Sequence, residues 1–499
     1  MSQPSPSGGV RKVLRDIAGL ATSQYALRIG NLIKGFAVAR ILGPAGNGLW
    51  QHFSLIFEYS NYANFGVLPG YTKELGHRVG RGQQGEIDVA KDTGLAGVFY
   101  SAIALWIGLI VYVVLAGDSL DPVDRWGLPV LGLIVVLEQV TNTYKALLRA
   151  YSRIGIISRV ALTFAVANLS LGLALLFPLK ILGLMIAWLV TRAATTIWLI
   201  RASGYGFRPR INPAVLKTLI VTGFPIYLFH LTNVAMRNID RVLVDSVLDK
   251  ADLGIYGIAV TLSGLVRYGA DAVGFVIYPI YLRLYGETSD PTRLRERLDK
   301  PTLFIALFVP IVLGVLWLSL HLPIRWLLPE YEASIDVFRL LTVSVIFSCL
   351  GILPGFFMMA IDRQNVLVPL GLLAVAFNYF VGFEAIDRGY GLPGVAGVTG
   401  VGLVFHTTIV FLLAGRAAFD SWGGAVRWIG RTYLPIVYFA AVVLGLDQLK
   451  SRDPFAGWSD VPQTVALVAI FLVMTVPVLW QFERRTAFLQ ELKKARRKG

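Results

Sequence analysis

Long apolar runs recur along the whole chain, and they restrict its fold more than any other feature. Three of them are GLAGVFYSAIALWIGLIVYVVLAG (94–117), LFIALFVPIVLGVLWLSL (303–320) and VALVAIFLVMTVPVLW (465–480). A helix needs about 20 mainly apolar residues to cross the hydrocarbon core of a bilayer. Only 15% of the residues are charged, against about 25% in a soluble domain. The chain is therefore predicted to be an all-α polytopic membrane protein.

Fourteen membrane-spanning helices are predicted from these runs. Segments rich in proline and glycine, such as LGPAGNG and FRPRINP, mark several of their ends. The predicted spans are 17–42, 47–68, 93–116, 127–148, 155–177, 181–200, 216–247, 253–284, 301–320, 336–361, 365–384, 392–414, 431–447 and 463–482.

The distribution of charge predicts the orientation of these spans. An even number of spans places both termini on one side of the membrane. The loops and tails assigned to that side hold 30 Lys and Arg against 13 Asp and Glu, and the other side holds 7 against 13. Lys and Arg accumulate in cytoplasmic loops, so both termini are expected in the cytoplasm. The net charge of +15 is attributed to these loops, and no nucleic-acid partner is expected.

Segments of the two halves of the chain match at a nearly constant offset. ILGPAGNGLW (41–50) aligns with VLDKADLGIY (247–256) at an offset of 206. RAYSR (149–153) aligns with MAIDR (359–363) at 210, as does Asn168 with Asn378, and LGLMIA (182–187) resembles YGLPGVA (390–396) near 208. Repeats of the same orientation are related by an axis along the membrane normal. We therefore expect two six-helix lobes, with the substrate between them.

The predicted organisation follows from the spans and the repeat. Helices 13 and 14 lie outside the repeat and are expected to be an appendix to the second lobe. The predicted parts are a cytoplasmic tail (1–16), an N-lobe (17–201), a cytoplasmic linker (202–215), a C-lobe (216–415), helices 13 and 14 (416–482) and a basic cytoplasmic tail (483–499).

Charged side chains remain at membrane depth after the loops are assigned. Each costs about 2.5–3.5 kcal/mol at a lipid-exposed helix centre, so they are expected to face an interior cleft or a partner. Cations outnumber carboxylates, which favours an anionic cargo such as phosphate or diphosphate, because Arg–phosphate contacts are strong and geometrically specific. These residues are Arg28, Lys34, Arg40, Lys145, Arg192, Arg237, Arg241, Arg267, Arg339, Glu58, Glu138, Asp240, Asp245 and Asp271.

Helical spacing places several of these groups on common faces. Steps of three and four residues keep side chains on one side of a helix. This pattern occurs in the first predicted helix of each lobe. The predicted cationic cavity residues are Arg28, Lys34, Lys145, Arg192, Arg237 and Arg241, and the predicted polar lining residues are Gln24, Asn31, His230 and Asn233.

Structural pairing is the competing interpretation of the same charges. Arg241 and Asp245 are four residues apart, as are Arg267 and Asp271, so each pair can form within one helix. Asp240 is three residues from Arg237. Arg28, Lys34, Arg192 and Arg237 have no evident partner on their own helix, which favours a ligand-facing role for them. The candidates for ion or proton coupling are Glu58, Asp240 and Asp271.

Three segments carry a resemblance to a known family. VARILGPAGNGLW (38–50), NIDRVLVDSVLDKADLGIYGIA (238–259) and GYGLPGVAGVTG (389–400) resemble segments of Wzx-type polysaccharide flippases, which belong to the multidrug/oligosaccharidyl-lipid/polysaccharide (MOP) superfamily. The resemblance implies two six-helix bundles around a cationic central cavity, and alternating access. It implies an undecaprenyl-diphosphate-linked oligosaccharide as cargo in a bacterial cytoplasmic membrane. By location, Arg28 and Arg237 would hold the diphosphate.

The resemblance also sets expectations for partners. These are the lipid-linked substrate, membrane lipids and other polysaccharide-assembly proteins, with the chain itself a monomer. No Walker-type Gly-Lys-Ser/Thr loop is present in the sequence, and no cofactor or metal is expected.

Two rival functions remain open at this point. A drug or cation antiporter of the same superfamily would share the fold but need an anionic or apolar cavity, which the surplus of cations disfavours. A membrane glycan polymerase or ligase would act on similar lipid-linked sugars. The sequence contains no metal-ligand cluster, nucleophile motif or large external loop that such an enzyme would need, so a non-enzyme is favoured.

Overall fold

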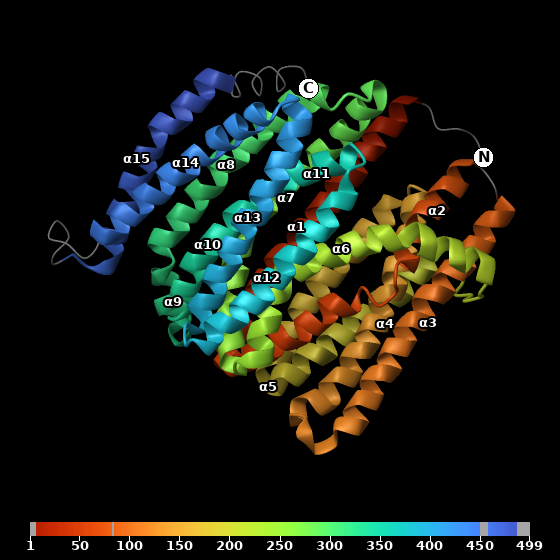
Figure 1. Cartoon of the computed structure of the whole chain (residues 1–499). Coiled ribbons are helices and arrows are strands. Elements are labelled where there is room, and N and C mark those ends of the chain that lie inside the picture. Colours follow the sequence, from red (N-terminus) through yellow and green to blue (C-terminus); the bar gives the residue numbers. More distant parts are fainter. Residues whose placement is uncertain (1–5, 82–83, 450–457, 487–499) are drawn as a thin grey trace. The chain divides into compact units, whose positions relative to one another are not determined.

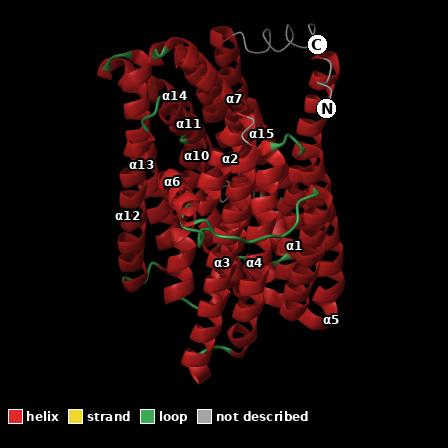
Figure 2. Ribbon diagram, turned by 90° about the vertical axis from the view of Figure 1, so that its right-hand side faces the viewer, coloured by secondary structure: helices red, strands yellow, loops and turns green. Residues whose placement is uncertain are grey.

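The structure is a computed structural model that describes the backbone of residues 6–81, 84–449 and 458–486, and side chains within 30–79, 86–449 and 458–484. In these ranges every regular element is a helix, and no strand occurs (Figures 1 and 2). Most of the described loops between helices are short, and the segment of residues 204–212 is a longer one (Figure 2). The predicted all-α class is confirmed.

The chain divides into two compact units, residues 1–238 and 239–499. The division falls within the sixth helix, whereas the predicted limits of the lobes at 202–215 stay predictions. The helices that begin in the first unit are α1 (Pro6–Ser60), α2 (Val67–Arg81), α3 (Gln84–Ala116), η1 (Gly117–Ser119), α4 (Pro122–Ala150), α5 (Ile154–Ser203) and α6 (Pro213–Val247).

The second unit contains the end of α6 and all later elements. These are α7 (Lys250–Thr288), η2 (Pro291–Leu294), α8 (Arg295–Ser319), α9 (His321–Leu327), η3 (Pro329–Tyr331), α10 (Ser334–Leu350), α11 (Ile352–Ala360), η4 (Gln364–Val366), α12 (Leu367–Asp387), α13 (Gly391–Phe419), α14 (Trp422–Leu449) and α15 (Asp460–Thr486).

Two of the long helices each contain two predicted spans. In α1 the break is at Gly43, which has φ 66° and ψ −176° and precedes Pro44. In α5 it is at Lys180, with φ 51° and ψ −127°, two residues after Pro178. With α10 and α11 taken as one interrupted span, the fourteen predicted spans correspond to helical segments of the described chain. Ten of the described helices are long and apolar enough to cross a membrane.

The region after the second predicted span differs from the prediction. The span was expected to reach residue 68, but α1 ends at Ser60 and a turn follows it. Phe65 and Gly66 have φ values of 46° and 92°, and the Asn64 side-chain oxygen accepts a hydrogen bond from the Gly66 N–H at 3.3 Å. These left-handed backbone angles separate α1 from the helix that follows, because a right-handed helix needs negative φ.

A further helix, α2, occupies part of a segment that was predicted to be a loop. Its sequence is polar overall, so it carries no signal of a membrane span. Val67, Tyr71 and Leu75 recur every four residues and are all buried, which is the pattern of one apolar helix face. That face joins an apolar cluster of the first unit, which also includes Tyr144 and Leu219.

The appended helices pack within the second unit. Phe439 of α14 and Phe471 of α15 are almost fully buried with Leu303 and Leu307 of α8 in one apolar cluster. α14 and α15 therefore have a packing role in the described structure, on the helix α8. The polar groups of interest lie elsewhere, on α1, α4, α5 and α6 in the first unit and on α6 and α7 in the second.

Candidate functional site

A charged triad joins α4 and α5 in the first unit. An Nη atom of Arg192 lies 2.6 Å from Oε2 of Glu138, and Nζ of Lys145 lies 3.7 Å from Oε1. Glu138 and Lys145 are seven residues apart, so they share one face of α4. The Arg192 and Glu138 side chains are 10% and 11% exposed, and that of Lys145 is 24% exposed. Two cations share one carboxylate here, so the triad carries a net charge of +1.

The hydrogen bonds of this triad are incomplete. Nε of Arg192 is buried and has no hydrogen-bond partner among the described residues. The guanidinium also lies over the ring of Phe164, 3.7 Å from its centroid. The contact of Arg192 with Glu138 is an ion pair without the alignment of a hydrogen bond. Arg192 is thus held in place by two neighbours, while one of its donors remains unused.

A second polar group lies where α1 and α6 approach each other in the first unit. The side-chain amide of Asn238 donates a hydrogen bond to Glu58. The charge of Arg237 interacts electrostatically with Tyr62 and with His230, and the Glu58 carboxylate interacts in the same way with Tyr62. Three predicted site residues, Glu58, His230 and Arg237, therefore lie within electrostatic range of one another or of Tyr62.

Aromatic rings border this second group. Tyr62 and Tyr227 lie with their centroids 6.3 Å apart, and Phe224 stacks on Tyr227 at 5.7 Å. Asn233, predicted to line a cavity, donates from its side-chain amide to the carbonyl oxygen of Phe229 at 2.8 Å on its own helix. The aromatic rings offer flat apolar faces beside a charged group.

Lys34 lies in a separate place, between α1 and α5. It is 5% exposed, and its Nζ donates to Oδ1 of Asn168 at 2.9 Å. Nζ also lies 4.7 Å from the centroid of the Trp50 ring. Asn168 in turn donates to the hydroxyl of Thr191 at 3.1 Å. The Lys34 ammonium therefore lies in the interior of the first unit, among neutral polar and aromatic partners.

The second unit has a buried carboxylate at Asp240. One of its oxygens accepts from the backbone N–H of Arg241 and the other from the hydroxyl of Tyr256, both at 2.8 Å. Tyr256 also interacts with Thr399, and the Thr399 hydroxyl donates to Oδ1 of Asn378 at 3.2 Å. Asp240 thus belongs to a polar network inside the second unit.

The remaining predicted residues have varied surroundings. Asp271 pairs with Arg267 at 3.7 Å, as their spacing predicted. Asp245 pairs with Lys250 at 2.6 Å, and Arg241 is half-buried. Asn31 is exposed. The side chains of Gln24 and Arg28 lie outside the described residues, so their predicted roles are not placed.

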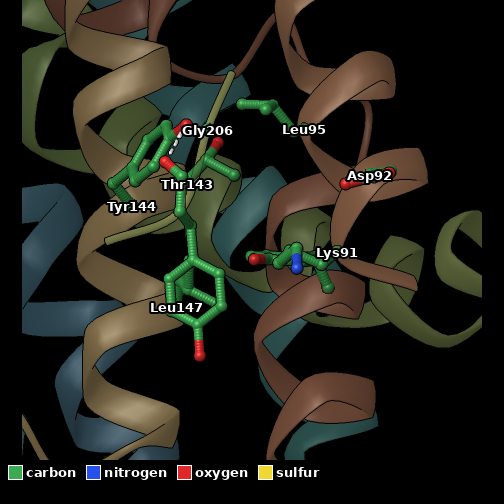
Figure 3. A pocket seen from close by; sticks show the side chains of 9 residues that line it. Lys91, Asp92, Leu95, Thr143, Tyr144, Leu147 and Gly206 are labelled. Atoms are coloured by element: carbon green, nitrogen blue, oxygen red, sulfur yellow. Dashed lines mark hydrogen bonds between the residues drawn. The ribbon is translucent and has the colours of Figure 1, made fainter. Parts of the chain in front are cut away.

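A pocket in the first unit contains none of the predicted residues. Thr143, Tyr144 and Leu147 of α4 line it, with Lys91 and Asp92 of α3 among the other residues (Figure 3). The Tyr144 hydroxyl donates to the carbonyl oxygen of Tyr205 at 3.3 Å. Its lining is partly tyrosine and threonine, residue types that hydropathy and buried charge do not single out.

Comparison with known proteins shows which family and which solved structures resemble this chain. Residues 90–328 match the family described as "Polysaccharide biosynthesis protein". A comparison with the curated proteins found no match. Among solved structures, an inward-facing MATE family multidrug resistance transporter of the MOP superfamily has a TM-score of 0.67 at 14% identity, covering 81% of this chain and 95% of that one.

Two further solved structures are similar over most of the chain. The lipid II flippase MurJ in an inward closed conformation has a TM-score of 0.64 at 13% identity, covering 92% of this chain and 99% of that one. An outward-facing MATE transporter of the MOP superfamily has a TM-score of 0.57 at 15% identity, covering 84% and 96%. At such identities the likeness shows the fold.

The chain is a multi-pass membrane protein with the fold of the MOP superfamily. These three solved neighbours are two transporters and a flippase. Together with the match to the polysaccharide biosynthesis family, this fold confirms the resemblance to Wzx-type polysaccharide flippases that the sequence predicted.

Proposed function

We propose that the chain is a flippase that moves an undecaprenyl-diphosphate-linked oligosaccharide repeat unit across the bacterial cytoplasmic membrane, for surface polysaccharide or exopolysaccharide assembly. The observation that carries the proposal is the net positive triad of Glu138, Lys145 and Arg192 inside an apolar unit. A buried cation surplus is stabilised by an anion, and a diphosphate supplies acceptor oxygens for several donors. The match to a polysaccharide biosynthesis family supports the sugar part of the cargo.

Within this proposal Arg192 and Lys145 receive the diphosphate. Glu138 and Phe164 hold the guanidinium of Arg192 in position, so that its unused Nε–H is available to a phosphate oxygen. Lys145 is the more exposed cation of the triad and would make the first contact. Arg28, Arg237 and Arg241 remain proposed cationic contacts, with Gln24, Asn31, His230 and Asn233 as proposed polar ones.

The sugars would lie against aromatic faces such as those of Tyr62 and Tyr227, next to Arg237. Transport would proceed by alternation between inward-facing and outward-facing states, both of which occur among solved proteins of this fold. Both termini are proposed to be cytoplasmic. The cation surplus favours this proposal over a drug or cation antiporter, because organic cations would be repelled.

The diphosphate site can be tested by binding. Lys145→Gln should weaken binding of a lipid-diphosphate oligosaccharide to the purified chain about tenfold or more, since a hydrogen bond to a charged group contributes about 1.5–3 kcal/mol. Arg28→Ala and Arg237→Ala should weaken it in the same direction. Arg388→Ala is the matched control, because Arg388 is 66% exposed and pairs with Glu384. Equal binding by all of these variants and the wild type would remove the proposed site.

Ion coupling is a separate part of the proposal. Glu58, Asp240 and Asp271 are the carboxylates proposed to take up a proton or ion during the cycle. Replacing all three by amides (Glu58→Gln, Asp240→Asn, Asp271→Asn) should reduce transport in proteoliposomes and abolish its dependence on the driving ion gradient. Each amide keeps the shape of the carboxyl group and loses its charge. Unchanged transport with unchanged ion dependence would refute this role.

A further inference from the structure

The internal repeat relates the buried centre at Lys34 to the one at Asp240. An offset of 206, read from the first two helices of each half, carries Lys34 onto Asp240 and Trp50 onto Tyr256. An offset of 210 carries Asn168 onto Asn378, and 208 carries Thr191 onto Thr399. All four residues of each set are in contact through one network. Each unit therefore contains the same polar centre, built from equivalent positions.

The two centres carry opposite charges on this shared framework. In the second unit the charged group is a carboxylate, and Tyr256 supplies a hydroxyl donor to it. In the first unit the charged group is an ammonium, and the equivalent aromatic residue, Trp50, supplies the face of its ring. A ring face attracts cations and a hydroxyl hydrogen attracts anions, so each aromatic residue matches the charge beside it.

The Lys34 centre is less complete than its counterpart. An ammonium has three N–H donors, and among the residues that the structure describes Lys34 uses one of them, on Asn168. Among the described residues no carboxylate lies within 4.0 Å of its Nζ. A charge buried without a counter-ion is costly. Asp240, by contrast, has a donor on each of its oxygens.

A small pocket lies beside this ammonium. It is lined by Gly30, Asn31, Lys34, Phe164, Ala165, Asn168 and Leu169. The Arg192 guanidinium lies over the ring of Phe164, so a second cation is close to the residues that line the pocket. The pocket has room for about one water-sized species. It is too small for a phosphate group with its four oxygens.

We propose that this pocket binds a single small monovalent anion of the halide class, such as chloride, with Lys34 as its principal ligand. The anion accepts hydrogen bonds from the remaining N–H groups of Lys34 and neutralises the buried charge of its ammonium. The site goes beyond the proposed flippase function, because it lies within the first unit and takes a free inorganic ion in place of the cargo. Lys34 is thereby assigned to an ion site, whereas the sequence had suggested a place in the cargo cavity.

Halide titration of the purified chain tests this proposal. In a gluconate buffer of constant ionic strength, added chloride should raise the melting temperature of the wild type and saturate, because a ligand that binds the folded state stabilises it. Lys34→Met should lose this saturable rise. Asn168→Asp should lose it as well, because it places a carboxylate beside the ammonium in place of the anion, without removing the lysine. Lys217→Met, at an exposed lysine, should keep it.

Inorganic phosphate at the same ionic strength distinguishes the two possible sources of negative charge. Phosphate should give no saturable rise that depends on Lys34. A larger Lys34-dependent rise with phosphate than with chloride would place Lys34 in the cargo site and overturn the halide assignment. The assignment also fails if the wild type shows no saturable response to chloride, or if Lys34→Met and Asn168→Asp both keep it.

Discussion

Arg192→Met is expected to destabilise the folded chain by about 3–5 kcal/mol, the range found when one partner of a buried ion pair is removed. The variant leaves Glu138, whose side chain is 11% exposed, with only the longer contact to Lys145 at 3.7 Å. Transport of the lipid-linked cargo should fall below detection in the same variant. Chemical unfolding in detergent and a proteoliposome flipping assay measure the two effects.

The double variant Glu138→Gln/Arg192→Met separates packing from cargo binding. It removes both charges of the shorter ion pair but leaves the Lys145 ammonium without its carboxylate, so only part of the lost stability should return. Transport should not return, because the guanidinium proposed to bind the diphosphate is still absent. Arg416→Met is the control, since Arg416 and its partner Asp420 are 41% and 82% exposed and exposed pairs contribute about 0–1 kcal/mol. Recovery of transport in the double variant would limit Arg192 to a structural role.

Gly223→Ala is expected to lower stability by at least about 1–3 kcal/mol, the usual cost of overpacking. A Cβ at Gly223 would lie 1.9 Å from the carbonyl oxygen of Gly66 and 2.4 Å from the backbone nitrogen of Gly70. These contacts are with backbone, which cannot rotate away as a side chain can. The glycines thus allow α6 and the start of α2 to approach backbone to backbone, as small residues do between membrane helices.

Gly76→Ala provides the matched control for this prediction. Gly76 belongs to α2, and a Cβ there would meet nothing within 4 Å. Alanine favours a helix over glycine by about 0.5–1 kcal/mol, so this variant should be neutral or slightly more stable. Chemical unfolding followed by circular dichroism measures both variants. A loss at Gly76 equal to that at Gly223 would show that close approach is not the cause.

Hydropathy predicted the spans well because each span is a local property of the sequence. The helix α2 was missed for the same reason, since its polar composition conceals a buried face at Val67, Tyr71 and Leu75. The break between α1, which ends at Ser60, and α2 contains left-handed backbone angles at Phe65 and Gly66, which no hydropathy pattern reports. The kinks at Gly43 and Lys180 likewise stand where the prediction of spans assumes a loop between two consecutive helices.

The partners of the buried charges could be predicted only in part. Arg267 and Asp271 pair along one helix, as spacing indicated. Arg192 and Lys34 find their partners on other helices, at Glu138 and Asn168, and such tertiary contacts leave no local pattern. The repeat contained a usable signal, because the offset that aligns Asn168 with Asn378 accompanies one that aligns Lys34 with Asp240. The contacts of Trp50 and Tyr256 with these charges could be recognised only from the three-dimensional structure.

The kinks at Gly43 and Lys180 have a consequence for topology mapping. Helical hydrogen bonding continues to both sides of each kink, so neither site presents an extended stretch of backbone. Proteases cleave exposed loop tips, and the same tips tolerate inserted reporters. Protease protection and reporter fusions would therefore miss both turns and count two fewer hairpins than the chain contains, while single-cysteine labelling beside each turn would still detect them.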